Sequence, residues 1–114
     1  MLFRGLVRLN VNTPPWKILL TSKGVNISSS GILVQFDNDS ICEQLDLVDI
    51  HYLLTEGDEV GVQLEHQDID LPIAYLPATV VRKKIINDYL LEVGLMFRKS
   101  TDELKSLIHE IHQN

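Results

Sequence analysis

The 114-residue chain contains a single cysteine, Cys42, and lacks several features that mark common protein classes. One cysteine can form neither an internal disulfide nor a zinc site built from several thiolates. No apolar run approaches the roughly 20 residues needed to cross a bilayer, and the first residues do not have the pattern of a secretory signal. The sequence therefore predicts a cytoplasmic protein without membrane insertion.

Acidic residues are missing from one part of the chain. Residues 1–36 carry four basic side chains and no acid, whereas residues 37–114 carry six basic and sixteen acidic side chains, so the net charge is −6. An acidic body without a broad basic face argues against DNA or RNA as a partner. The positive segment suits a compact anion, and the alternative is a chance fluctuation of charge over a short stretch.

Patterns of catalytic and metal-binding residues are also missing. The sequence shows no nucleophile paired with a base and no glycine-rich phosphate loop. It also shows no pair of carboxylates in surroundings that would shift the pKa of one of them. His109 and His112 have helical i, i+3 spacing, but no third metal ligand is indicated, so exposed helix histidines are the preferred interpretation. We therefore expect a binding protein that is not an enzyme and has no cofactor and no metal site.

Short runs that alternate apolar and polar residues predict one mainly β domain over residues 1–114. The expected strands are residues 16–20, 23–27, 31–36, 60–64, 78–86 and 89–97. A tight turn is expected at Thr21 and Ser22. Because Pro14 and Pro15 cannot donate to a strand ladder, residues 1–13 are expected to form an extended arm in front of the barrel of residues 14–97.

Two further segments do not follow the strand pattern. Residues 37–56 fit no single period and are expected to form a loop with one irregular element. Near the end of the chain, apolar residues recur at i, i+3, i+4 and i+7, which predicts an amphipathic helix over residues 100–112. The residues of this stripe are Leu104, Leu107, Ile108 and Ile111.

Two motifs carry the functional signal. Arg4 and Arg8 form R-x-x-x-R, and arginine is suited to phosphate oxygens and to the edge or face of guanine. Asn26, Ser28 and Gly31 form N-x-S-x-x-G, in which an amide and a hydroxyl can bond a purine while glycine supplies a positive φ and a close backbone approach. The alternatives are a pair of solvated arginines and a serine-rich hairpin turn.

A third basic group, Arg82-Lys83-Lys84, lies in an expected strand. Its default role is a solvated face or protection of a sheet edge. One of its side chains is nonetheless a candidate for reaching a ligand phosphate.

The order of these motifs resembles that of the PilZ domain family, whose members bind cyclic di-GMP. Residues 93–97 and the terminal helix also look like that family's G-x-x-F ending and its closing helix. The resemblance implies a six-stranded antiparallel split β-barrel, with cyclic di-GMP held by Arg4, Arg8, Asn26, Ser28 and Gly31. It also implies that ordering of the arm relays the signal to an effector protein. The alternative is a PilZ-fold interaction adaptor that binds no nucleotide.

Overall fold

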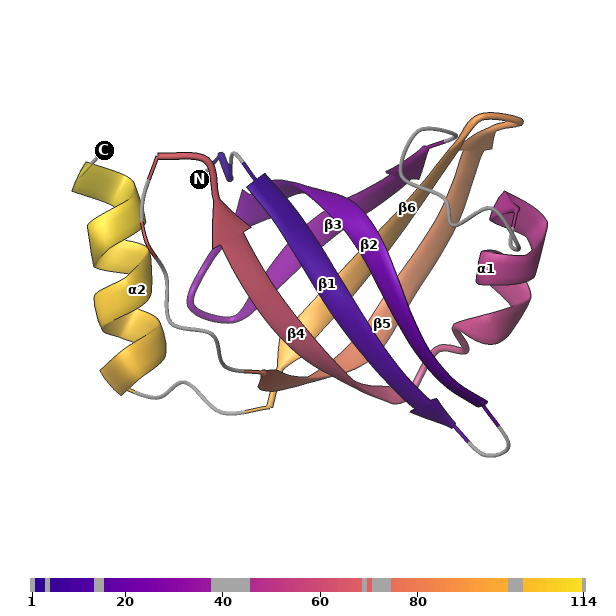
Figure 1. The fold of residues 1–114 in the computed structure, drawn as a ribbon, viewed down its shortest axis with the longest axis horizontal. Coiled ribbons are helices and arrows are strands. Elements are labelled where there is room, and N and C mark those ends of the chain that lie inside the picture. The colour runs from indigo at the N-terminus through magenta and orange to yellow at the C-terminus, as the bar shows by residue number, and fades with distance from the viewer. Residues whose placement is uncertain are drawn as a thin grey trace.

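Six antiparallel strands close into a barrel in the computed structural model, which describes residues 2–3, 5–13, 16–37, 46–68, 70, 75–98 and 102–113. Around the barrel the strands follow the order β1-β2-β3-β6-β5-β4 (Figure 1). The elements are β1 (Gly5–Thr13), β2 (Trp16–Ile27), β3 (Gly31–Asp37), α1 (Leu47–Leu53), β4 (Glu59–His66), β5 (Leu76–Asn87), β6 (Leu90–Phe97) and α2 (Asp102–Gln113). The predicted mainly β barrel with a terminal helix is confirmed. Within these ranges, no helix is long and apolar enough to cross a membrane.

The barrel interior is filled by alternate residues of each strand. In β1 the side chains of Val7, Leu9 and Val11 are fully buried, while Arg8 and Asn10 between them face outward. The same alternation continues in β3, β4 and β6, as expected for strands with one face on a core. This period therefore decides which polar side chains are available on the outer surface.

The predicted N-terminal arm is wrong for residues 5–13, because these residues are β1. β1 pairs with β2 from Leu6 to Thr13 on one side and with β4 from Gly5 to Val11 on the other. Thr13, the last residue of β1, pairs with Trp16, the first residue of β2. Pro14 and Pro15 come between them in the sequence and lie outside the described residues. Prolines interrupt a ladder only where they stand, so they do not prevent a strand that ends before them.

The predicted turn at Thr21 and Ser22 is also wrong, because β2 runs unbroken through both residues. Ser22 is fully buried, and its hydroxyl donates a hydrogen bond to the carbonyl oxygen of Val7 at 2.8 Å. A buried hydroxyl is tolerated in a strand when it has such a partner. The predicted number of strands is nevertheless right, because merging two expected strands offsets the addition of β1.

The irregular element expected within residues 37–56 is α1. Asp46 caps this helix: its side chain accepts from the Asp49 N–H, and the Asp49 side chain accepts from the Asp46 N–H. Ile50 and Leu54 are buried in the core, so α1 covers one end of the barrel (Figure 1). At the end of α1, the Lys83 Nζ donates to the carbonyl oxygen of His51 at 2.7 Å. The missed signal was the reciprocal Asp46–Asp49 capping box.

The predicted terminal helix is present as α2 at the opposite end of the barrel (Figure 1). Leu104 and Ile111 are buried in the core cluster, and Leu107 and Ile108 are partly buried against it. The apolar stripe thus packs against its own domain. The helix stabilises the barrel by removing this stripe from water.

We expect the amides of Val7, Leu9 and Val11 to exchange slowly with solvent in the absence of any ligand, because β1 is hydrogen-bonded along both edges. Hydrogen–deuterium exchange read residue by residue would measure this, with the exposed turn residue Ser29 as the fast-exchanging control. Exchange in β1 as fast as at Ser29 would restore the arm interpretation.

Replacing Leu104 by Ala should lower the free energy of unfolding by about 2 to 5 kcal/mol, because it leaves a cavity between α2 and the barrel. Denaturant titration would measure the loss. The matched control is Lys105→Ala on the exposed side of the same helix, which should change stability by no more than about 0.5 kcal/mol. Equal stability of the two variants would show that α2 does not contribute to the core.

Candidate functional site

The Ser28 hydroxyl organises the turn between β2 and β3. It accepts hydrogen bonds from the N–H groups of Ser30 and Gly31, each at 3.3 Å, and lies 2.9 Å from the hydroxyl of Ser30. The backbone closes the turn with a bond from the Ser28 N–H to the Gly31 carbonyl at 2.9 Å. Ser28 therefore has the conformational role expected of a serine in a tight turn, and it remains exposed.

Gly31 is required by close packing of two strands. The prediction that it supplies a positive φ is wrong, since Gly57 is the positive-φ glycine of the described residues. A Cβ built at Gly31 would lie 2.3 Å from the carbonyl oxygen of Leu95 in β6. Only hydrogen fits at that distance, so glycine lets β3 approach β6 at the end of the turn.

Asn26 lies at a β-bulge of β2 and is exposed. The register of β2 with β3 shifts between Gly24 and Asn26, which leaves Val25 as the additional residue. Within the described part of the chain, the Asn26 side chain has no hydrogen-bonding partner. Its amide donor and carbonyl acceptor are therefore available to a ligand.

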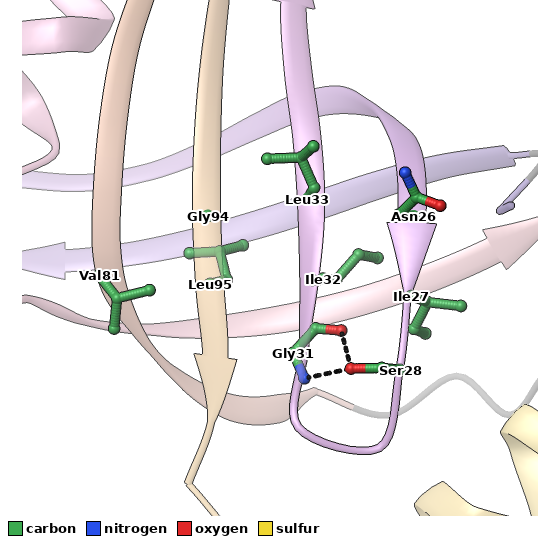
Figure 2. Close-up of a pocket in the computed structure, with 9 residues that line it drawn as sticks. All are labelled: Asn26, Ile27, Ser28, Gly31, Ile32, Leu33, Val81, Gly94 and Leu95. Atoms are coloured by element: carbon green, nitrogen blue, oxygen red, sulfur yellow. Dashed lines mark hydrogen bonds between the residues drawn. The ribbon is translucent and has the colours of Figure 1, made fainter. Parts of the chain in front are cut away.

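Asn26, Ser28 and Gly31 line one open groove of about 330 Å³ on the outer face of the barrel. The other lining residues come from β2, β3, β5 and β6 and are apolar or glycine: Ile27, Ile32, Leu33, Val81, Gly94 and Leu95. Figure 2 shows Asn26 and Val81 at opposite sides, with Leu33 and Gly94 between them. The arrangement is an apolar floor with polar groups at one side, and its volume is within the range of small-molecule sites.

The structure does not bring Arg8 to this groove. Arg8 lies opposite Thr21 in the β1–β2 register, so Asn26 is five residues further along β2, or about 16 Å at about 3.3 Å per residue. The Arg8 guanidinium forms an ion pair with Glu65 of β4, on the side of β1 away from β2. The side chain is thus directed away from the groove.

Arg4 lies outside the described residues. Its chain neighbours Leu2 and Phe3 pair with β2 beside the groove: Leu2 forms a bridge with Asn26, and the Phe3 N–H donates to the Val25 carbonyl at 3.0 Å. Phe3 is buried, with its ring beside Gly24. The chain on the N-terminal side of Arg4 is therefore anchored next to Asn26.

Positive charge in residues 1–36 is partly neutralised by acids from later in the chain. Besides the Arg8–Glu65 pair, the Lys23 Nζ lies 2.8 Å from a carboxylate oxygen of Asp37. Sequence counting treats these lysine and arginine charges as a free positive segment, whereas the fold distributes them among ion pairs. The expected cationic patch is reduced accordingly.

Six of the groove-lining residues were not among the predicted site residues, and Val81 and Gly94 are two of them. Gly94 did carry a usable signal, because an isolated glycine inside a strand often marks a place where another group approaches the backbone closely. Val81 faces outward by simple alternation with the buried Ala78 and Val80, but an apolar residue on an outer face does not by itself indicate a site.

Comparison with known proteins shows which solved structures have a similar fold. No protein-family model and no curated protein matches the sequence. Among solved structures, the chain is similar to the PilZ domain of YcgR from Escherichia coli, which was solved with c-di-GMP, with a TM-score of 0.59 and 11% identity over 96% of this chain and 82% of that one.

A second similar structure is the PlzA protein of Borreliella burgdorferi in complex with c-di-GMP. The TM-score is 0.54 and the identity is 15%, over 97% of this chain but only 46% of PlzA. This chain thus spans under half the length of PlzA. Together the two structures show that the barrel with its terminal helix has a PilZ-like fold.

Proposed function

We propose that this protein is a receptor for cyclic di-GMP and that the nucleotide binds in the groove beside Asn26. The observation that carries the proposal is the groove itself, which gathers Asn26, Ser28 and Gly31 over an apolar floor on a PilZ-like barrel. The two similar structures were solved with this nucleotide, which supports the choice of ligand.

Each residue has a distinct role in this proposal. The free amide of Asn26 bonds the edge of a guanine, and Ser28 adds its exposed hydroxyl while holding the turn in shape. Leu33 and Gly94, which are cross-strand partners, offer an apolar surface on which a base can lie. Arg4, next to the anchored Phe3, supplies a charge-assisted bond to a phosphate. Arg8 is left out because it lies on a different part of the barrel.

The signal is relayed through the surface of the groove. The ordering of a long arm is not available for this purpose, because Gly5–Thr13 is already a barrel strand. An open groove leaves one side of a bound nucleotide in contact with solvent. A partner protein would recognise that exposed nucleotide together with the β2–β3 turn beside it.

The second candidate function is a PilZ-fold adaptor that binds a partner without nucleotide. Two observations favour it: Arg8 is paired with Glu65, and the Ser28 hydroxyl is engaged in its own turn. An ion pair on the surface and a hydrogen bond within a turn are roles that these two motif residues would have in the absence of any ligand.

Isothermal titration calorimetry should show binding of cyclic di-GMP, with GMP and ATP binding far more weakly. The closed dinucleotide presents guanine edges and phosphates together, whereas each mononucleotide lacks part of that arrangement. Equal affinity for GMP would contradict the proposed ligand. No heat with any nucleotide, in protein that is folded by circular dichroism, would favour the adaptor.

Asn26→Ala should weaken cyclic di-GMP binding by about 1 to 3 kcal/mol, or roughly tenfold to a hundredfold, without lowering the melting temperature. Ser28→Ala should lower both affinity and melting temperature, because it also removes the acceptor that organises the turn. Calorimetry paired with thermal melting would separate the two effects. Wild-type affinity in Asn26→Ala would remove this residue from the site.

The two arginines should behave differently. Arg4→Ala should reduce affinity for cyclic di-GMP, while Arg8→Ala should leave it within about twofold, because an exposed ion pair far from the groove contributes little. Calorimetry on both variants would test this. A large loss in Arg8→Ala alone would show that the nucleotide binds elsewhere on the barrel.

A further inference from the structure

We infer that Arg82, which lies next to the groove-lining residues Val81 and Gly94 on the side opposite Asn26, binds a phosphate of the nucleotide in the groove. This inference rests on the proposed function and adds a residue to the same site. It comes from the strand register, which brings together residues that are far apart in the sequence.

One row of cross-strand partners runs across four strands. Asn26 of β2 is paired with Leu33 of β3, Leu33 with Gly94 of β6, and Gly94 with Arg82 of β5. The two ends of the row are three strand spacings apart, or about 14 Å between Cα atoms at about 4.8 Å per strand. Asn26 and Arg82 are therefore in register on either side of the apolar floor.

The bulge in β5 turns Arg82 outward. Ala78 and Val80 are buried, so unbroken alternation would direct Arg82 toward the core as well. The register with β6 shifts between Val80 and Arg82, and both Val81 and Arg82 are exposed. The shift places two consecutive side chains on the outer face, one apolar and one cationic.

Gly94 has no side chain and so leaves open the space beside Val81 and Arg82. A Cβ built at Gly94 would lie 3.4 Å from the Cβ of Arg82 and 3.8 Å from a methyl carbon of Val81. Arg82 therefore rises from the same face as the groove floor, directly beside Gly94. These separations are ordinary van der Waals contacts, so the barrel itself does not require glycine at this position. The open space above Gly94 is therefore available to the ligand.

The guanidinium of Arg82 is available for binding. Of the three arginines in the described ranges, Arg8 is paired with Glu65, and Arg98 is paired with Glu59 at 3.0 Å. The Arg82 side chain has no hydrogen bond or ion pair with any residue that the structure describes. A free guanidinium on a residue beside an apolar groove can bond two oxygens of one phosphate that enters the groove.

Lys84 provides a matched control on the same strand. It is exposed and outward, but its cross-strand partner is Glu92, one row beyond the groove. Glu92 accepts a hydrogen bond from the Gln35 Nε2 at 2.9 Å. A cation facing this carboxylate belongs to a neighbouring row, and its removal changes the net charge as much as removal of Arg82 does.

The test compares cyclic di-GMP binding by wild type, Arg82→Ala, Arg82→Lys and Lys84→Ala in calorimetry at low and high salt. Arg82→Ala should lose about tenfold or more in affinity, which is the effect of one charge-assisted pair, and its affinity should depend less on salt. Arg82→Lys should recover only part of the loss, because an ammonium cannot form the bidentate pair. Lys84→Ala should stay within about twofold of wild type.

A second variant tests the open floor. Gly94→Ala should keep or raise the melting temperature, because glycine weakens a strand, and should reduce affinity because the methyl group occupies the groove. Wild-type binding together with equal affinities in Arg82→Ala and Lys84→Ala would overturn the role of Arg82 and leave the proposed function intact. Absence of binding by the wild type itself would overturn both.

Discussion

Closure of the barrel by β1 is the interaction on which the rest of the structure depends. β1 is the strand that joins β2 on one side to β4 on the other, so its two ladders convert an open sheet into a ring without free edges. Closure fixes the alternation of Val7, Leu9 and Val11 into the core, and the same alternation fixes Arg8 on the outside. A residue in a doubly paired strand cannot move toward a ligand as a residue of a free arm could.

Local signals in the sequence were sufficient for most of the architecture. The alternation of apolar residues located β3, β4, β5 and β6, and the four-residue apolar stripe located α2. The predictions were wrong where a segment is determined by a partner that is distant in the sequence. Pro14 and Pro15 predict an unpaired segment before them, whereas β1 pairs with β4, some fifty residues away in the chain. The expected turn at Thr21 and Ser22 separates two short strands, whereas in the fold β2 continues through both residues and the Val7 carbonyl accepts the hydrogen bond of the buried Ser22 hydroxyl.

For the site, as for the fold, the local motif was predictable from the sequence and the contacts from distant strands were not. Asn26, Ser28 and Gly31 are close in sequence and could be recognised as one motif, and they do line one groove. The reason for Gly31 was different from the expected one, because the carbonyl of Leu95 that excludes a side chain there belongs to a distant strand. Strand register brings Val81 and Gly94 to the same groove as Asn26, and no spacing within the sequence encodes that register.

The bulge in β5 also separates two adjacent cations. It reverses the phase of the strand, so that Arg82 turns to the outer face and Lys83 turns to the opposite face, where its Nζ holds the last turn of α1 through the His51 carbonyl. Two adjacent cations thus lie on opposite faces of β5, Arg82 beside Gly94 and Lys83 bonded to α1. The groove and the helix at the mouth of the barrel are therefore contacted by consecutive residues of one strand.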